Sequence, residues 1–377
     1  MARRLRGKSK LQPEPDLRAA IGQLLIMGFE GTEIAPLASL LARIQPAGVI
    51  LFARNIESIE QTWRLLKACH DRVRLPLFTC VDLEGGTVDR FRNVIGPTPS
   101  AAGVYASGDR RLFLKHGKLI GQACRAFGFN LDFAPVVDLA FPASRAVMSS
   151  RAVSNDPREV IAYARQFLAG LSSAGVIGAG KHFPGLGEAN LDTHHELPTV
   201  KKSFKKMWNE DLYPYRALRR QLPLVLVAHA SYSGRRDPRP ASLSREWITG
   251  VLRKKIGYRG LVVSDDLEMG GVLKAAPIEE AALSHIEADG DLCLICRQQE
   301  FVERAYECLL ATAERDRLFR KRVVESARRV AAFKVGSRAV RKKLVVPPAD
   351  MTDRLSRALW SFSEEVELGT IKRQADR

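Results

Sequence analysis

The sequence predicts an α/β protein built as a single (β/α)8 barrel of the TIM type, with a helical C-terminal extension. Three observations predict this fold. Short, almost continuously apolar runs recur eight times along the 377 residues, as expected of parallel strands buried on both faces. Helix-like segments separate most of these runs, which is typical of parallel βα units. Eight such units fit a closed barrel that carries some long loops.

The elements follow one another along the chain. The expected strands cover residues 23–29, 47–52, 77–82, 129–135, 177–183, 223–229, 260–266 and 289–296. Helices are expected at 57–73, 110–128, 156–175, 203–221 and 244–257. Asp156 and Pro157 suit the start of the helix at 156–175, and Ser244 and Gly257 suit the two ends of the helix at 244–257. An open doubly wound sheet is the alternative, but no GxGxxG pattern follows the first strand.

Length and composition place the chain among ordinary globular proteins. We divide it into a basic N-terminal tail (1–15), a barrel domain (16–340) and a C-terminal extension (341–377). The tail lacks the apolar core of a secretory signal, and no apolar run is long enough to span a membrane. We therefore expect a cytoplasmic, monomeric protein with no membrane span.

The cysteines and the net charge limit the kinds of metal site, disulfide and binding partner that we expect. Six cysteines are too few for a disulfide framework, and the CLIC motif at 293–296 has no second pair to complete a zinc site. Buried reduced thiols are expected instead. The net charge of +17 is dispersed, with a concentration at 315–343 whose apolar spacing indicates a solvated helix face. No zinc-finger or aromatic RNA-binding pattern occurs, so no specific nucleic-acid binding is expected. Docking of this basic region to an anionic polymer or membrane remains an alternative.

Ionisable residues stand at successive ends of the expected strands. They are Asp82, Asp132, Lys181, His182, His229, Asp265 and Asp266. Because a barrel of parallel strands presents all its C-terminal ends at one face, we expect these side chains to converge on one pocket. The simpler explanation, that polar loops begin there, accounts for one or two of them. Asp132 and Asp138 are more typical of buried acceptors, Glu84 of a loop-shaping carboxylate, and His229 fits the pocket floor as well as a sugar contact.

The loop KHFPGLGEANLDTHHELP (181–198) follows the fifth expected strand. Asp192 and His194 are two residues apart, so they can meet across a tight turn. An aspartate that binds one imidazole nitrogen raises the basicity of the ring and leaves the other nitrogen free for proton transfer. A carboxylate nucleophile would complete a two-step displacement site, and Asp265 is the candidate. Asp266 is the alternative, although neighbouring strand residues point to opposite faces.

Six segments in order resemble the β-N-acetylglucosaminidases of glycoside hydrolase family 3, the type used in bacterial cell-wall recycling. These segments are GVILFARNIES (48–58), VDLEGGTVDRF (81–91), NLDFAPVVDL (130–139), the stretch 150–157, the 181–198 loop, and 240–272. The resemblance implies a TIM barrel that hydrolyses terminal N-acetyl-β-glucosaminides, with muropeptide fragments as the expected substrates, through a covalent glycosyl-enzyme.

The resemblance also implies residue roles. Asp265 would be the nucleophile, and His194 the acid/base with Asp192 as its partner. The residues implied to bind the sugar are Asp82, Arg90, Arg151, Lys181 and His182. No metal or cofactor is implied, and the partner is a carbohydrate. Leu186 and Thr87 stand where the family usually has His and often has Arg. A glycoside phosphorylase and a non-catalytic sugar-binding barrel are the alternative functions.

Overall fold

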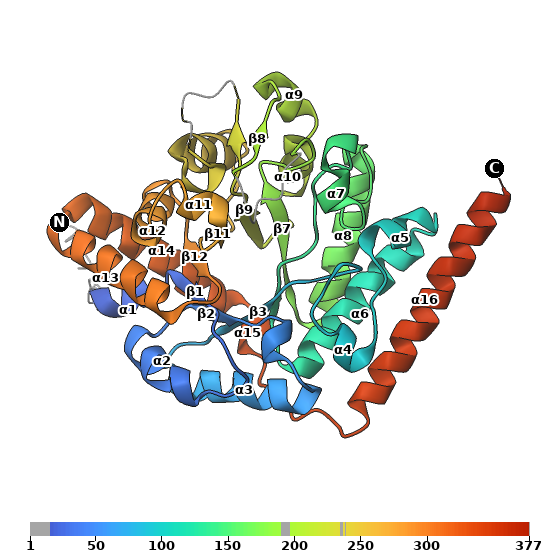
Figure 1. Cartoon of the computed structure of the whole chain (residues 1–377), viewed down its shortest axis with the longest axis horizontal. Coiled ribbons are helices and arrows are strands. Elements are labelled where there is room, and N and C mark those ends of the chain that lie inside the picture. The colour runs from blue at the N-terminus through green and yellow to red at the C-terminus, as the bar shows by residue number, and fades with distance from the viewer. Residues whose placement is uncertain (1–15, 190–196, 234–236, 238, 377) are drawn as a thin grey trace, which may run out of the picture.

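The computed structural model of the protein is a closed barrel of parallel strands surrounded by helices (Figure 1). It describes residues 16–189, 197–233, 237 and 239–376. The predicted fold class is therefore confirmed, and the open sheet is excluded. The strands are β1 (Leu25–Met27), β2 (Gly48–Ile50), β3 (Phe78–Val81), β6 (Leu131–Asp132), β7 (Ile177–Phe183), β9 (Leu224–Val227), β11 (Leu261–Asp266) and β12 (Leu292–Ile295).

Each strand pairs with its neighbour in the sequence, and the last pairs with the first. β1 joins β12 through the register Leu25 opposite Cys293 and Met27 opposite Ile295. All eight strands lie inside the runs that the sequence predicts, although several are shorter. The C-terminal ends of the strands therefore meet at one face, as the convergence argument requires.

Helices return the chain from one strand to the next on the outside of the barrel. They are α2 (Ala38–Ile44), α3 (Ile59–Arg72), α6 (Arg111–Phe127), α8 (Pro157–Ala174), α10 (Leu212–Leu218), the π-helix η5 (Glu246–Lys255), α12 (Ile278–Glu287) and α13 (Gln299–Arg315). As predicted, Asp156 caps α8, because its side chain accepts the Arg158 N–H, and Pro157 opens the helix. Alternate strand residues fill the barrel interior, including Ile50, Leu131 and Leu226.

Shorter elements precede the barrel or lie within its loops. They are α1 (Leu17–Gly22), η1 (Ala35–Leu37), η2 (Ala53–Asn55), β4 (Leu83–Gly85), β5 (Val88–Asp89), α4 (Arg92–Ile95), α5 (Ala101–Ala106), η3 (Pro142–Ser144), α7 (Arg145–Met148), β8 (Thr199–Val200), α9 (Phe204–Asn209), β10 (Ser231–Tyr232), η4 (Ala241–Leu243) and α11 (Gly270–Leu273). The β3–α6 connection carries β4, β5, α4 and α5.

Two of the expected helices differ from the prediction. The segment 203–221 is divided into α9 and α10, because Glu210 adopts non-helical angles between them. The segment 244–257 is a π-helix whose first residues receive no side-chain cap, so Ser244 does not have the predicted role. Gly257 does end this segment, with φ at +76°.

The N-terminal end of the barrel is closed by α14 (Arg317–Gly336) and α15 (Arg338–Arg341). Val330 of α14 and Val340 of α15 belong to the same apolar cluster as the strand interior. The buried Lys334 of α14 donates to Gln23 Oε1 at 2.7 Å and lies 4.9 Å from the centre of the Phe78 ring. This end of the barrel is therefore plugged by the chain that follows the last strand.

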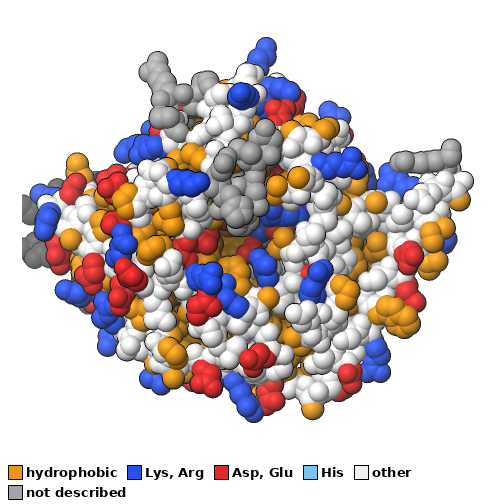
Figure 2. Space-filling model, viewed as in Figure 1, with side chains coloured by type: hydrophobic (Ala, Val, Ile, Leu, Met, Phe, Trp, Pro, Cys, Tyr) orange, Lys and Arg blue, Asp and Glu red, His pale blue; other side chains and the backbone are white. Residues whose placement is uncertain are grey.

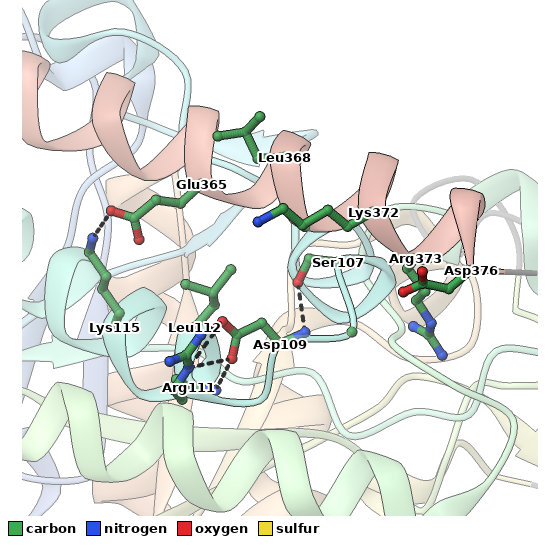
Figure 3. Close-up of a pocket in the computed structure, with 12 residues that line it drawn as sticks. Ser107, Asp109, Arg111, Leu112, Lys115, Glu365, Leu368, Lys372, Arg373 and Asp376 are labelled. Carbon is green, nitrogen blue, oxygen red and sulfur yellow. Dashed lines mark hydrogen bonds and ion pairs between the residues drawn. The ribbon is translucent and has the colours of Figure 1, made fainter.

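The C-terminal extension contains the helix α16 (Met351–Ala375), which lies along the outside of α4, α5 and α6 (Figure 1). Phe362 stacks on the ring of His116 with centroids 5.7 Å apart. Glu365 pairs with Lys115 of α6 at 2.5 Å (Figure 3). This extension is thus helical, as predicted, while the proposed domain boundaries remain a prediction.

The remaining expectations concern the cysteines and the membrane. All six cysteines are free, and all except Cys308 are buried, which agrees with the expected thiols. Among the described helices, none combines the length and apolar character that crossing a bilayer requires.

Candidate active site

The C-terminal ends of the strands surround a cavity of about 120 Å³. Of the eight site residues predicted from the sequence, six line this cavity: Asp82, Arg90, Arg151, Lys181, His182 and Asp265. The other two, Asp192 and His194, lie outside the described residues. Side chains from β7, β11 and the long loops after β3 and β6 therefore meet in one place.

Lys181 forms the centre of the cavity wall. Its Nζ atom lies 2.7 Å from Asp82 Oδ1 and 2.6 Å from Glu84 Oε1, and its side chain is only 3% exposed. Burial alone would lower the pKa of Lys181, but the two carboxylates outweigh it and hold this pKa above its usual value. Lys181 is therefore a buried ammonium ion whose charge is balanced by Asp82 and Glu84.

Glu84 joins Lys181 to Arg151. The Arg151 guanidinium donates from Nε to Glu84 Oε2 at 2.7 Å and from Nη2 to Oε1 at 2.8 Å, a bidentate pair. Burial raises the pKa of Glu84, yet Arg151 and Lys181 together hold it well below its usual range. The carboxylate interpreted from the sequence as loop-shaping thus organises two of the predicted sugar-binding cations.

His182 is fixed by a second buried carboxylate. Asp138 Oδ2 accepts the His182 Nδ1–H at 2.6 Å and the His182 backbone N–H at 3.1 Å, while Oδ1 accepts the Leu186 N–H at 2.8 Å. The other ring nitrogen, Nε2, lies 3.2 Å from Arg151 Nη2. Asp138 and Arg151 thus hold opposite sides of the ring and fix its orientation. Asp138 therefore orients a cavity residue and the start of the 184–197 loop.

Asp265 lies at the end of β11 and faces the cavity. Burial raises its pKa, but the imidazoles of His229 and His182, the backbone N–H of Asp266 and the Lys181 ammonium outweigh burial and lower it. The Asp266 N–H bond to Asp265 Oδ1 measures 2.9 Å. Asp265 is therefore ionised at neutral pH, as a carboxylate nucleophile has to be.

Asp266 is placed differently from its neighbour. Its Oδ1 accepts the backbone N–H groups of Glu268 at 3.0 Å and Cys296 at 3.2 Å. Burial raises the pKa of Asp266 to about 7. Asp266 thus connects the end of β11 to the end of β12 and does not line the cavity, which favours Asp265 over Asp266 as the reacting group.

Two further strand-end residues also turn to other partners. His229 is close to Ser242 Oγ at 2.6 Å and to the Asp266 carbonyl at 2.9 Å, and does not line the cavity. Asp132 accepts the Leu83 N–H at 2.9 Å. His229 thus has buried partners outside the cavity lining, and Asp132 is the buried acceptor that was predicted.

Arg90 approaches the cavity from the loop that follows β5. Its guanidinium carbon lies 5.4 Å from the centre of the Phe52 ring, and its buried Nε has no hydrogen-bond partner among the described residues. Of the two positions that depart from the family pattern, Leu186 lines the cavity, and Thr87 Oγ1 lies 2.8 Å from Ser150 Oγ. The described residues hold no group of three or more acidic, His or Cys side chains suited to a metal ion.

Comparison with known families settles the relationship. Residues 16–333, more than half of the chain, match the profile described as the glycosyl hydrolase family 3 N terminal domain. The chain belongs to glycosyl hydrolase family 3. This family 3 chain is 40% identical to a β-hexosaminidase of Alkalilimnicola ehrlichii over 286 residues, which cover 74% of this chain and 82% of the relative. It is 32% identical to a β-hexosaminidase of Idiomarina loihiensis over 84% of this chain and 94% of the relative.

Solved structures agree with these relatives. A glycoside hydrolase family 3 β-N-acetylglucosaminidase from Paenibacillus sp. str. FPU-7 superposes with a TM-score of 0.87 at 31% identity, over 93% of this chain and 69% of that chain. The β-N-acetylglucosaminidase of Thermotoga maritima gives a TM-score of 0.73 at 27% identity, over 83% of this chain and 67% of that one. The predicted family 3 glycoside hydrolase of the β-hexosaminidase type is thereby confirmed.

Sequence reasoning did not recognise the part that Glu84 has in this family 3 site. One signal was available, because Asp82 and Glu84 are two residues apart and both lie next to the expected strand, so they point to the same side. Asp138 was recognised as a buried acceptor, but its partner was not, because His182 lies 44 residues later in the chain.

Proposed function

We propose that this family 3 enzyme is a retaining, exo-acting β-N-acetylglucosaminidase, with muropeptide fragments of the cell wall as its expected substrates. The observation that carries the proposal is the ionised Asp265 in the same small cavity as Asp82, Arg90, Arg151, Lys181 and His182. β-Hexosaminidase is the activity named for the relatives at 40% and 32% identity.

The first step forms a glycosyl-enzyme. An Asp265 carboxylate oxygen attacks C1 of the sugar, the C1–O bond to the leaving group breaks, and the leaving oxygen takes a proton from the His194 imidazolium. In the second step His194 removes a proton from water, the water oxygen bonds to C1, and Asp265 is released. Two inversions at C1 retain the anomeric configuration. The role of His194, with Asp192 as its partner, rests on the sequence.

The proposed binding residues line a cavity wall whose charges are balanced, which suits a neutral sugar. Lys181 and Arg151 are neutralised by Asp82 and Glu84, so they have N–H groups fixed in direction and available to hydroxyl and N-acetyl oxygens. Asp82 can accept from a hydroxyl while it holds Lys181. The unpaired Nε of Arg90 is a further donor. We assign these residues, with His182, to the subsite of the terminal N-acetylglucosamine.

The adjacent aspartates provide a matched test. Asp265→Asn is expected to lower kcat on 4-nitrophenyl N-acetyl-β-glucosaminide by about 10³-fold or more, because a neutral amide is a poor nucleophile. Asp266→Asn keeps the acceptor oxygen for Glu268 and Cys296 and is expected to retain activity within about tenfold. Mass spectrometry after a 2-fluoro sugar should find the label on Asp265. Equal losses in both variants, or a label elsewhere, would reject the assignment.

His194→Ala tests the acid/base proposal. A good leaving group needs little protonation, so hydrolysis of 4-nitrophenyl glycosides should fall much less than hydrolysis of N-acetylglucosaminyl disaccharides. Added azide should accelerate the variant on the activated substrate by replacing the water that His194 would deprotonate. The same loss with both substrate types would contradict an acid role.

The proposed substrate class and acceptor can be measured in one assay. Hydrolysis of the N-acetyl-β-glucosaminide is compared with that of the plain β-glucoside, with and without inorganic phosphate. We expect a strong preference for the N-acetylated sugar and no acceleration by phosphate. Release of a sugar 1-phosphate would indicate a phosphorylase instead.

A further inference from the structure

We propose that the end of the barrel opposite the candidate active site docks on an anionic membrane surface. Two neighbouring grooves form this end, and we call them together the basal surface. One groove, of about 1160 Å³, lies between the ends of α8 and α10 and the α14–α15 turn; its basic residues are Arg338, Arg341 and Lys342. The other, of about 470 Å³, lies between α6 and the start of α16; its basic residues are Arg125, Lys342, Lys343 and Arg354. Lys342 lines both, so the grooves are adjacent.

Most of the basic residues of the basal surface have no acidic partner among the described residues. None of the described residues lining either groove is an Asp or Glu, and the sequence has no acidic residue from 326 to 349. Among the described contacts, Arg354 pairs with Asp350, whereas Arg338, Arg341, Lys342 and Lys343 have no carboxylate partner. A cluster of four to eight basic residues attracts the negative surface of a membrane.

Two other parts of the surface combine basic residues with acidic ones. On the face shown in Figure 2, Lys and Arg side chains alternate with Asp and Glu side chains. The groove between α16 and the α5–α6 turn has basic residues as well, but Lys115 is paired with Glu365 and Arg111 with Asp109 (Figure 3). That groove is lined by Asp109, Glu365 and Asp376 as well, whereas the two basal grooves have basic lining residues and, in the described part of the chain, no acidic ones.

Exposed aliphatic side chains accompany the charge. Val345 and Val346 are 74% and 64% exposed, and only Leu344 separates them from Lys342 and Lys343. Basic residues beside exposed apolar residues are the combination by which peripheral proteins bind anionic lipids. Binding of single-stranded nucleic acid generally uses aromatic stacking, and Phe333 is the one aromatic side chain among the described lining residues. The pair of valines therefore favours a lipid partner.

The position of the basal surface suits a docked enzyme. Its lining includes Ile177 at the N-terminal end of β7 and Pro223 just before β9, while His182 lies at the other end of β7. A membrane bound at the basal surface would leave the cavity open on the opposite side. Docking would therefore concentrate the enzyme at a membrane without covering the site.

Vesicle binding by the full chain tests this proposal. The wild type should sediment with vesicles that contain about 30% phosphatidylglycerol and remain in solution with pure phosphatidylcholine; raising the salt to about 0.5 M should release it. Lys342→Glu/Lys343→Glu should lower the affinity by about 30-fold or more, the effect of removing two basic contacts. Val345→Ser/Val346→Ser should also weaken vesicle binding, since both side chains are exposed and their replacement leaves the core intact.

A charge-matched control separates a surface from a net-charge effect. Arg317→Glu/Lys321→Glu changes the net charge equally at the far end of α14, where both residues are exposed, and should change vesicle affinity less than about twofold. No binding to anionic vesicles, or equal losses in both double variants, would overturn the proposal. Binding to duplex or single-stranded DNA that matches vesicle binding and ignores the valine changes would also overturn it, in favour of a nucleic-acid partner. Activity on the soluble aryl substrate is measured alongside and is expected to be unchanged.

Discussion

Among the cavity residues, Glu84 is expected to affect stability and activity most, because its one buried carboxylate compensates two buried cations. Glu84→Gln would leave Arg151 and Lys181 with less negative charge and place amide hydrogens against their donors. Breaking such a buried pair costs about 3–5 kcal/mol of unfolding free energy. We expect kcat/KM to fall by about 100-fold as well, because both cations would lose their fixed position. Urea unfolding and steady-state kinetics measure the two effects; an active variant of wild-type stability would contradict this role.

The same carboxylate predicts a pH dependence. The pKa of Glu84 is lower in the folded protein than its ordinary value of 4.5. Its contribution to stability is therefore complete above about pH 4.5 and is lost as the pH falls below it, since the unfolded state takes up the proton first. Between about pH 5 and pH 3 the unfolding free energy of the wild type should decrease more steeply than that of Glu84→Gln. If the two proteins lost unfolding free energy equally with falling pH, the pKa of Glu84 would not be lowered in the folded protein.

Sequence alone was enough to place a residue in the candidate site when that residue lies at the end of a barrel strand. Asp82, Lys181, His182 and Asp265 were found in this way, because parallel strands bring their ends together whatever the details of packing. Asp265 was preferred to Asp266 from strand alternation and from the family resemblance, and the cavity lining, which includes only Asp265, favours the same choice. Roles that depend on a partner, as for Glu84 with Arg151, depend on loop paths that no local pattern encodes.

Among the elements, α16 is held by one apolar face, which a pair of aromatic residues can test. Phe362 is fully buried, whereas Trp360 on the opposite side is 69% exposed. Phe362→Ala is expected to lower the unfolding free energy by about 3 kcal/mol and to speed hydrogen exchange of the α16 amides. Trp360→Ala, the control, should stay within about 0.5 kcal/mol of the wild type. Similar effects of the two substitutions would mean that α16 is not anchored through this face.

The two helices that were predicted wrongly depend on features that the spacing of apolar residues does not show. A continuous helix was expected over 203–221, but the buried Lys202 binds Glu210 and Asp211, each at 2.6 Å, at the point where α9 ends. The spacing of apolar residues does not reveal this ion cluster. Likewise, a pattern of 3.6 residues cannot be told from the wider turn of η5 over ten residues, because the same side chains, Trp247 and Val251 among them, face the core.

For the molecule as a whole, the plug of α14 and α15 places a lysine in the core. Burial lowers the pKa of Lys334 to about 7, against an ordinary 10.5, and Gln23 is its neutral partner. The unfolded chain therefore binds one more proton than the folded protein between about pH 7 and pH 10, so stability should rise with pH in this range. Lys334→Met should remove this rise and increase stability at pH 6 by about 1–3 kcal/mol.

Denaturation curves at several pH values check this expectation. The exposed Lys342→Met is the control and should keep the slope of the wild type. If Lys334→Met also kept the wild-type slope of stability against pH, or lost stability at pH 6, Lys334 would be charged and well compensated in the folded state.

Most of the architecture was accessible from the sequence because it depends on repetition. Eight apolar runs with helical segments between them restrict the topology to very few folds, and each run became a strand. The plug at the base could not be predicted in the same way. Val330 and Val340 are ordinary helical residues in the sequence, and only closure of the barrel gives them an interior to fill.

The seam between β1 and β12 has a consequence for how activity arises during synthesis. A ribosome translates Asp82 long before Asp265, and the seam needs Leu292–Ile295, which come later still. A nascent chain can therefore neither hold a saccharide nor attack it while it is incomplete. Glycosidase activity should therefore appear only when the last strand pairs with the first, so that unfinished or truncated chains are inactive.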